Sequence, residues 1–223
     1  MFTGLVQAVG VVESVQRTGR GSDGPVRLRI NPGSWGHHPA HGDSISVSGC
    51  CLTVANRPSP RAKVLEFVAV PETLSKTKLG TLRAGSRVNL EHSLTANTLV
   101  GGHFVQGHVD GVGTIAGVKA DDDWRMRVRL PKALQPYIVP KGSICLDGVS
   151  LTVAEVHRDG LSVALIPTTL ELTTLRDLRP GDPVNVEADM IVKTVVSWAE
   201  HAGFVARKPA VRRRAAKRAT ARR

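Results

Sequence analysis

The chain repeats itself, because four short blocks of its first half recur in the same order in its second half. The aligned pairs are residues 3–6 with 106–109, 49–54 with 148–153, 70–74 with 166–170, and 84–91 with 180–187. Self-similarity of this kind indicates a duplicated structural unit. The sequence therefore predicts two similar tandem domains of about ninety residues each, a size that can enclose its own core.

The segments that make up each copy are short, rich in β-branched residues and interrupted by glycine and proline. Such segments are typical of strands joined by tight turns. In the first copy we expect strands over residues 1–12, 25–30, 44–48, 49–54, 64–70 and 86–90, with a short helical turn after Pro71. Many short strands favour antiparallel barrels over open sheets with long edges. We predict an all-β chain with two tandem barrels.

The pattern changes from strand to helix after Glu187. Ile191, Val195, Trp198 and Ala202 recur at helical spacing, Asp189 is a candidate N-cap, and Gly203 is a candidate stop. The apolar stripe of this helix either packs on its own barrel or forms a subunit contact centred on Trp198.

The net charge of +11 is concentrated at the C-terminus. Residues 207–223 hold nine of the 30 Lys and Arg residues and no acidic residue, which leaves a nearly neutral body. We expect this segment to be a solvated, disordered arm. Nucleic-acid binding is disfavoured, because barrels that bind RNA display aromatic stacking residues and aromatic residues make up only 4% of this chain.

Three cysteines, two of them adjacent, do not form the even set of a secreted disulfide framework. No apolar run approaches the roughly 18 residues that a membrane span needs. We therefore expect a cytoplasmic protein with no membrane segment.

Two familiar site motifs do not hold. Residues 19–24 match the glycine pattern of a dinucleotide-binding loop, but a strand rather than a helix is predicted to follow, so we reject that site. His103 and His108 are five residues apart, which matches no common zinc spacing. We expect no metal.

The repeated 49–54 and 148–153 blocks carry small polar side chains at matching positions. In a strand, residues two apart share a face, so Cys51 and Thr53 point away from the core in the first copy, as Ser150 and Thr152 do in the second. Short hydroxyl and thiol side chains leave room for a flat polar heterocycle and offer it donors and acceptors. Solvent-facing strand residues would show the same pattern, but its repetition in both copies favours a pair of related pockets.

The glycine-rich stretch 101–111 opens the second copy and adds two histidines. His108 and Asp110 share a strand face, so the carboxylate could orient the imidazole as a proton carrier. A structural role in a glycine-rich turn is the alternative for either histidine.

Together, these blocks resemble the riboflavin synthase family of the alpha-chain type. The resemblance rests on the segments 1–4, 49–54, 101–111 and 147–153, and extends from residue 1 to about 205. It implies two similar six-stranded Greek-key barrels over residues 1–95 and 96–187, an oligomerisation helix over 188–205 and a disordered tail over 206–223. The family is homotrimeric and uses neither a metal nor an organic cofactor. Association with lumazine synthase is left open.

The resemblance also implies a reaction and a set of substrate contacts. The family converts two molecules of 6,7-dimethyl-8-ribityllumazine into riboflavin and 5-amino-6-ribitylamino-uracil, between the N-terminal barrel of one subunit and the C-terminal barrel of another. In the first barrel the implied contacts are Gly4, Leu5, Val6, Cys51, Leu52, Thr53, Val68, Ala69, Val70, Pro71, Glu72 and Thr73. In the second barrel they are Gly107, His108, Val109, Lys141, Ser150, Leu151, Thr152, Ala164, Leu165, Ile166, Pro167, Thr168 and Thr169.

Catalytic roles are a hypothesis built on those positions. The C7 methyl group of the lumazine is acidic because its carbanion is delocalised into the ring, so the protein must hold two rings together and manage protons. His108, Ser150 and Thr152 are the candidates for proton transfer and orientation, Cys51 for hydrogen bonding or addition at the other ring, and Asp189 for a role at the subunit boundary.

Three positions depart from the family pattern, namely Ser48, Thr168 and Arg176. The second copy has Asp147 at the position of Ser48, and the first copy has Gly80 at the position of Arg176. Each could alter binding in one barrel. A non-catalytic relative that binds lumazine or flavin as a fluorophore is the main alternative function.

Overall fold

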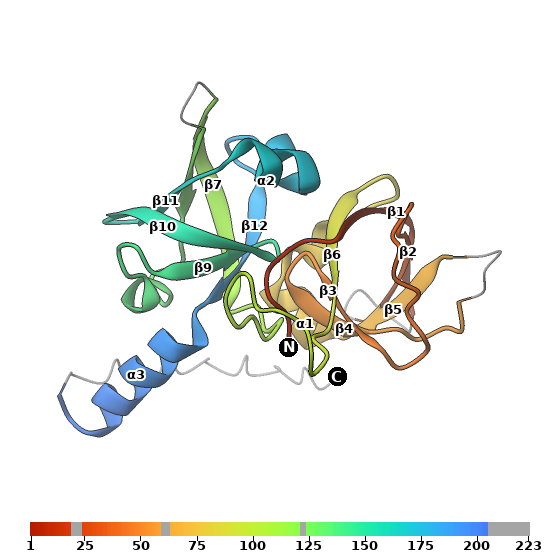
Figure 1. Ribbon diagram of the computed structural model, residues 1–223, viewed down its shortest axis with the longest axis horizontal. Coiled ribbons are helices and arrows are strands. Elements are labelled where there is room, and N and C mark those ends of the chain that lie inside the picture. The colour runs from red at the N-terminus through yellow and green to blue at the C-terminus, as the bar shows by residue number, and fades with distance from the viewer. Residues whose placement is uncertain (19–23, 59–62, 121–123, 205–223) are drawn as a thin grey trace, which may run out of the picture.

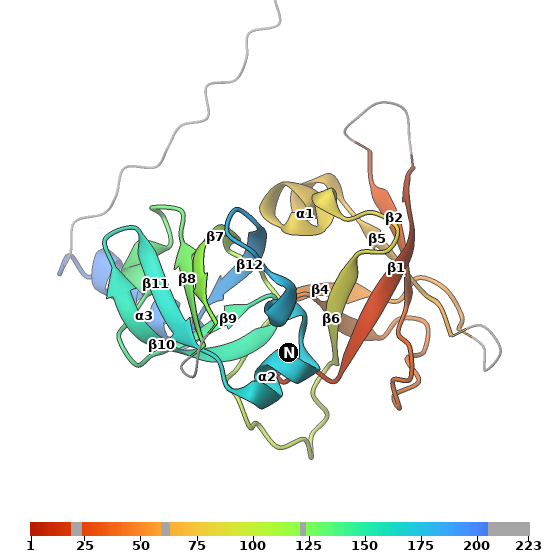
Figure 2. The ribbon, with the colours of Figure 1, turned by 90° about the horizontal axis from the view of Figure 1, so that it is seen from above.

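The computed structural model describes residues 1–18, 24–58, 63–120 and 124–204. Two antiparallel β-barrels lie side by side, and a single helix extends away from the second barrel (Figures 1 and 2). The two six-stranded barrels confirm the predicted fold class. The basic tail expected over residues 206–223 and most of the loop over 17–24 lie outside the described residues.

The first barrel contains six strands in the order β4-β3-β6-β1-β2-β5. Its strands are β1 (Ala8–Arg17), β2 (Val26–Asn31), β3 (Ser44–Val47), β4 (Cys50–Thr53), β5 (Leu65–Ala69) and β6 (Arg87–His92). A single antiparallel bridge between Val54 and Phe67 links β4 to β5 at the open edge. Between β5 and β6 the chain forms helix α1 (Pro71–Lys76) and the 3₁₀-helix η1 (Lys78–Thr81).

The second barrel repeats this order and is fully closed. Its strands are β7 (Gly111–Lys119), β8 (Arg125–Arg129), β9 (Ser143–Leu146), β10 (Val149–His157), β11 (Gly160–Ala164) and β12 (Pro183–Ala188). Its short helices are η2 (Gln135–Tyr137), α2 (Pro167–Leu172) and η3 (Thr174–Asp177). Because every first-barrel strand has a counterpart with the same neighbours, the duplication predicted from the four blocks is confirmed.

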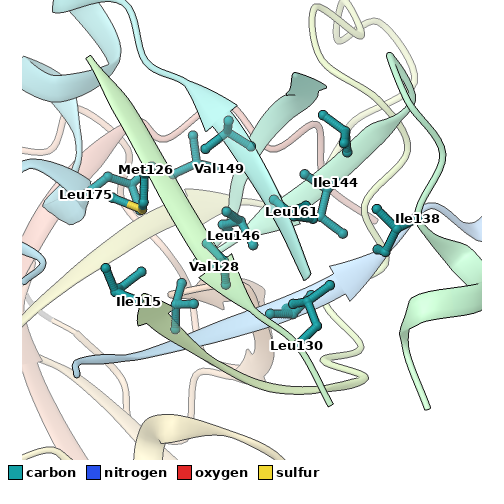
Figure 3. Packing of buried hydrophobic residues seen from close by; sticks show 14 of the residues in the cluster. Ile115, Met126, Val128, Leu130, Ile138, Ile144, Leu146, Val149, Leu161 and Leu175 are labelled. Carbon is teal, nitrogen blue, oxygen red and sulfur yellow. The ribbon is translucent and has the colours of Figure 1, made fainter. Parts of the chain in front are cut away.

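Each barrel encloses its own core through the two-residue alternation of its strands. In β2, for example, Val26, Leu28 and Ile30 are buried, whereas Arg27 and Arg29 point outward and pair with Glu66. Figure 3 shows the equivalent packing inside the second barrel, where Met126, Val128 and Leu146 lie among other buried apolar side chains.

Most of the expected strands are confirmed, but the one predicted over residues 1–12 is partly wrong. The first strand begins at Ala8, and within residues 1–7 only Phe2 forms a β-bridge, which pairs it with Val105. Gly4 has a φ of +75°, a left-handed conformation that ends an extended run. Its two β-branched residues therefore serve other contacts than a strand ladder, because Val6 packs against the second barrel and Thr3 donates to Glu91.

The predicted C-terminal helix is confirmed as α3 (Met190–His201). Asp189 caps it by accepting a 2.7 Å hydrogen bond from the Ile191 N–H, and Gly203 follows its end with a φ of +78°. No residue of α3 is buried, and Ile191, Val195 and Trp198 are 63%, 56% and 63% exposed. The apolar stripe of the helix is thus not covered by its own barrel.

Two asparagines at equivalent positions join the barrels through matching hydrogen bonds. The Asn89 side chain donates to the Asp147 carbonyl at 2.9 Å, and the Asn185 side chain donates to the Ser48 carbonyl at 2.7 Å. Their side-chain oxygens accept from the Thr174 and Lys78 amides, at 2.8 and 2.7 Å respectively. All four bonds cross between barrels, so each amide side chain ties one barrel to the turn and 3₁₀-helix of the other.

The centre of this junction allows only glycine. A Cβ atom added to Gly49 would lie 2.7 Å from the Gly148 nitrogen, and one added to Gly148 would lie 2.8 Å from the Gly49 nitrogen. Both residues also have positive φ angles. The two β-turns therefore approach backbone to backbone.

The junction is symmetric in its backbone but not in its charges. Asp147 is fully buried and forms an ion pair with Lys78, which opposes the rise in the Asp147 pKa that burial causes. At the equivalent positions on the other side of the junction, Ser48 stands in place of Asp147 and Thr174 in place of Lys78. Among the described residues the buried Thr174 hydroxyl has no hydrogen-bond partner. The departure at Ser48 thus removes one of two possible buried ion pairs.

We predict that Lys78→Met destabilises the protein by about 3 kcal/mol at pH 8, because it leaves the Asp147 carboxylate buried without a counter-ion. The loss should shrink as the pH falls, since burial raises the Asp147 pKa and protonation then neutralises the group. Urea unfolding measures both effects. Arg87→Met, which removes the exposed Arg87–Asp177 pair, should cost less than about 1 kcal/mol. Equal losses in the two variants would contradict a buried role for Lys78.

Candidate functional site

The small polar side chains of the repeated blocks point out of the barrels, as the two-residue period predicts. In β4, Leu52 and the adjoining Val54 are buried, whereas Thr53 is exposed and Cys51 half-buried. In β10, Val153 is buried, Leu151 packs half-buried against the core, Ser150 is half-buried and Thr152 is exposed. Both barrels therefore present a pair of small polar groups on an outer face.

An apolar row lies beside each polar pair. In the second barrel Val153 pairs with Val163, so the next residues, Thr152 and Ala164, are neighbours, and Ser150 and Ile166 lie two positions beyond them. In the first barrel Val54 pairs with Phe67, so Thr53 and Val68 are neighbours, and Cys51 and Val70 lie two positions beyond them.

The apolar rows are open to solvent. Val68, Val70 and Ile166 are all exposed, although each follows a buried residue. Large apolar side chains exposed beside hydroxyl and thiol groups suit a flat heterocycle with polar edges.

The segments that contact these faces are exchanged between the two barrels. The Gly4 carbonyl accepts a 2.8 Å hydrogen bond from the Ser150 N–H, and Val6 packs against the core of the second barrel. The Gly107 carbonyl accepts a 2.8 Å bond from the Cys51 N–H, and Val109 packs against the core of the first. We expected residues 4–6 in the first-barrel site and 107–109 in the second, and the structure places them the other way round.

This exchange escaped the sequence comparison for a physical reason. The two copies carry the same pattern, so self-alignment cannot tell on which copy a segment packs. At the contacts themselves, a Cβ atom on Gly4 would lie 2.6 Å from the Ser150 Cβ, and one on Gly107 would lie 2.6 Å from the Cys51 Cβ. Only glycine permits the two crossings.

His103, rather than His108, lies at the second-barrel face. Its Nδ1 atom is 2.7 Å from the Ser150 hydroxyl oxygen, and its backbone N–H donates to the Thr3 carbonyl at 3.2 Å. Burial lowers the His103 pKa, and the nearby Asp189 carboxylate partly opposes this effect. A neutral imidazole beside a hydroxyl is suited to accept its proton. The sequence signal was present, because His103 lies in the glycine-rich stretch.

The expected pairing of His108 with Asp110 is wrong. Asp110 accepts from the Ala188 N–H at 2.9 Å and from the Lys193 ammonium at 3.0 and 3.1 Å. The His108 side chain is exposed and follows Gly107, which lies on Cys51. The Ser150 contact is therefore made by His103, and His108 follows the glycine that lies on the first barrel.

The remaining predicted contacts lie around the same two faces. Residues 68–73 run from β5 into α1, and residues 164–169 run from β11 into α2, beside the polar pairs. Lys141 is exposed, with a φ of +63°, in the turn before β9, where its N–H donates to the Val153 carbonyl at 2.9 Å. Asp189 connects β12 to α3 as the helix cap.

Two buried glutamates that the sequence comparison did not single out hold the exchanged segments. The Glu91 carboxylate accepts from the Thr3 N–H and hydroxyl at 2.6 and 2.7 Å and from the Gly4 N–H at 3.0 Å. The Glu187 carboxylate accepts from the Gln106 N–H at 2.7 Å and the Gly107 N–H at 3.0 Å. Their signal was their shared place as the last residue of the fourth repeated block.

Burial raises the pKa of both carboxyls. That of Glu187 rises from its ordinary value of 4.5 to about 7, opposed by the Gln106 amide and Lys193 and assisted by Asp110. The pKa of Glu91 is also raised, against the hydrogen bonds from Thr3.

The structure offers no group of three or more metal-ligating side chains within its described ranges. The three cysteines are free, and burial raises the pKa of Cys50 to about 12 and that of Cys145 well above its ordinary value. No helix in the described ranges is both long and apolar enough to cross a membrane.

We predict that Glu187 makes the protein less stable as the pH rises. Its folded-state pKa of about 7 exceeds the ordinary 4.5, so between these values the folded chain holds a proton that the unfolded chain has lost. The free energy of unfolding should therefore fall by roughly 2 to 3 kcal/mol between pH 5 and pH 8 through this group. Urea unfolding of the wild type and Glu187→Gln at both values measures it.

The glutamine variant should lose this part of the fall, so its stability relative to the wild type improves from pH 5 to pH 8. Glu155→Gln, an exposed carboxyl on β10, is the matched control and should track the wild type. If the difference in free energy of unfolding between the wild type and Glu187→Gln is the same at pH 5 and pH 8, the pKa of Glu187 is not raised.

Comparison with known proteins shows the same duplication of the chain. The lumazine binding domain model matches twice, over residues 3–93 and 106–189. A riboflavin synthase of Mycobacterium tuberculosis is 42% identical over 208 residues, which cover 91% of this chain and 100% of that protein. The riboflavin synthases of Schizosaccharomyces pombe and Bacillus subtilis are 43% and 38% identical, over 86% of this chain and 91% and 87% of their own length.

Solved structures of LumP share the fold. LumP complexed with 6,7-dimethyl-8-(1'-D-ribityl) lumazine matches with a TM-score of 0.73 at 26% identity, and LumP complexed with riboflavin with a TM-score of 0.74 at 29% identity. Each comparison covers 84% of this chain and 99% of the LumP chain.

Proposed function

Because the chain belongs to the riboflavin synthase family, we propose that it is a transferase that converts two molecules of 6,7-dimethyl-8-ribityllumazine into riboflavin and 5-amino-6-ribitylamino-uracil. The observation that carries this proposal is the 42% identity to a riboflavin synthase along that protein's entire length. Both barrels also keep a face with small polar groups beside exposed apolar residues, which is the surface that two flat substrate rings require.

The reaction is balanced between its two substrate molecules. One lumazine gives up a four-carbon unit, which the other accepts to complete the third ring of riboflavin, and the donor leaves as the diaminouracil. Since the two substrates together contain all the atoms and electrons of the two products, no external oxidant or reductant takes part.

At the second-barrel face, Ser150 and His103 form the pair that transfers protons. A neutral His103 imidazole 2.7 Å from the Ser150 hydroxyl can accept a proton from it, while that hydroxyl faces the bound ring. Asp189 raises the His103 pKa and would stabilise the resulting cation. Thr152, on the same face, orients the ring.

The first-barrel face has a different set of groups. Cys51 and Thr53 take the places of Ser150 and Thr152, and His108 follows the segment that lies on Cys51. We propose that this face binds the second lumazine through Cys51 and Thr53, with His108 available for proton transfer there.

The two faces belong to different barrels and each is open to solvent, so a second subunit is needed to bring two rings together. The uncovered stripe of α3 supports this assembly, because Trp198 and its neighbours would otherwise remain in water. We propose a homotrimer in which the first barrel of one subunit faces the second barrel of the next. Its free cysteines suit the reducing cytoplasm.

A second candidate function follows from the LumP comparisons, namely binding of lumazine or riboflavin without turnover. Purified protein mixed with 6,7-dimethyl-8-ribityllumazine separates the two. Formation of one riboflavin per two lumazines consumed, followed by visible absorbance, supports the enzyme. Stoichiometric binding with no riboflavin formed would instead establish the fluorophore-binding function.

We predict that Ser150→Ala and His103→Gln each lower kcat by about 10²-fold, because each removes one member of a proton-transfer pair. Steady-state riboflavin formation gives the measurement. A second histidine and serine pair in the same barrel is the control, since His157 Nε2 lies 2.7 Å from the Ser162 hydroxyl near the end of β10 that is far from Ser150. His157→Gln and Ser162→Ala should keep kcat within about twofold. Unchanged turnover in both Ser150→Ala and His103→Gln would remove the pair from the chemistry.

We predict that Trp198→Asp combined with Ile191→Lys converts the trimer into monomers and abolishes turnover while both barrels stay folded. The charges would be buried in the proposed subunit contact but are harmless on an exposed helix. Sedimentation velocity and circular dichroism measure assembly and folding. Val156→Lys, at an exposed apolar residue of β10, should leave the trimer intact. A wild-type protein that sediments as a monomer would contradict this assembly.

A further inference from the structure

Glu91 and Glu187 occupy equivalent positions near the ends of β6 and β12, and each is only 3% exposed. Neither lies on a polar face. Each carboxylate instead binds two consecutive backbone amides, of Thr3 and Gly4 or of Gln106 and Gly107. A buried carboxylate is costly to desolvate, so its retention at both positions calls for a role beyond filling space.

The glutamates act directly on the contacts at the two faces. The Gly4 N–H donates to the Glu91 carboxylate, and the Gly4 carbonyl accepts from the Ser150 N–H. In the same way, the Gly107 N–H donates to the Glu187 carboxylate, and the Gly107 carbonyl accepts from the Cys51 N–H. Each glutamate is therefore separated from a polar face residue by one glycine, and that residue belongs to the other barrel.

We propose that Glu91 and Glu187 are positioning residues, each of which fixes the lumazine contacts of the opposite barrel by holding the segment that crosses to it. Glu91 of the first barrel sets the face that carries Ser150, and Glu187 of the second barrel sets the face that carries Cys51. This assignment of substrate rests on the proposed function. The holding of the two segments does not.

The tight packing around the glycines transmits any displacement. A Cβ atom on either glycine would come within 2.6 Å of its neighbour, so the backbone of each segment lies in contact with Ser150 or Cys51. His103 would move as well, since its N–H donates to the Thr3 carbonyl. Loss of a glutamate should therefore disturb the opposite face more than its own.

The two sets of hydrogen bonds from backbone amides to a glutamate, here called the Glu91 and Glu187 clamps, are unequal. Glu91 also binds the Thr3 hydroxyl at 2.7 Å, whereas Gln106 offers no hydroxyl at the matching position. The charges of Lys193 and Asp110 also act on the Glu187 carboxyl, the first lowering and the second raising its pKa. With one donor fewer, the Glu187 clamp should be the more sensitive to substitution.

The test uses Glu91→Gln and Glu187→Gln in the full chain, with Glu155→Gln as the control. Amide hydrogen exchange at pH 8, without ligand, reports on residues 3–6 and 106–109, which leave out the Phe2–Val105 bridge that joins the two segments. We expect Glu187→Gln to speed exchange at least tenfold in 106–109 and leave 3–6 unchanged, and Glu91→Gln to do the reverse. The glutamine retains one acceptor and the side-chain shape, so these variants should fold.

Kinetics and binding test the link to the faces. We expect each glutamine variant to raise KM for 6,7-dimethyl-8-ribityllumazine at least fivefold with a smaller change in kcat, because the clamps orient binding groups rather than react. Fluorescence titration of the same lumazine should show weakened binding. Glu155→Gln should match the wild type in all three measurements.

Two results would overturn the proposal: exchange that stays at the wild-type rate in both segments, or exchange that rises equally in both segments in each variant, which is general destabilisation. Local exchange changes with unaltered KM and lumazine affinity would overturn its link to the faces. If the wild type forms no riboflavin, the proposed enzymatic function fails, whereas the exchange and titration measurements still decide whether the glutamates position the segments.

Discussion

The exchange of two short segments between the barrels is the constraint on which the rest of the structure depends. The Gly4 and Gly107 carbonyls accept hydrogen bonds from the Ser150 and Cys51 amides of the opposite barrel. Phe2 and Val105 pair with one another at the centre, where they pack with Cys51 and Cys145. Neither outer face is complete without a segment that begins the other copy, so the two barrels form one functional unit rather than two independent domains.

The junction that permits this exchange is built mainly from backbone and amide groups. Asn89 and Asn185 satisfy carbonyls and amides of the opposite barrel, and Gly49 and Gly148 allow the turns to touch. Buried hydrogen bonds of this kind fix one relative orientation, because any other would leave polar groups unpaired. The outer faces inherit their positions from that orientation.

The duplication holds in the order of the strands but not in their chemistry. One side of the junction has the Lys78–Asp147 ion pair and the other has Thr174 and Ser48. One face has the Ser150 hydroxyl beside the half-buried His103 imidazole, and the other has the Cys51 thiol beside Gly107, which precedes the exposed His108. In the proposed reaction two identical substrates have opposite roles, as donor and acceptor of a four-carbon unit. Two faces of the same shape and different chemistry are suited to that division.

The sequence by itself determined the duplication, the strand-rich barrels, the capped terminal helix and the outward direction of Cys51, Thr53, Ser150 and Thr152. These features follow from local rules, since strand period, turn residues and helix caps act over a few neighbouring positions. The tertiary structure alone decided that residues 1–7 leave the sheet, that residues 4–6 and 107–109 change barrels, and that His103 rather than His108 meets Ser150. It alone showed Glu91 and Glu187 as the anchors of the crossing segments. Those outcomes depend on contacts between residues about 50 to 150 positions apart, and two copies with one shared pattern give no local signal of which barrel a segment will join.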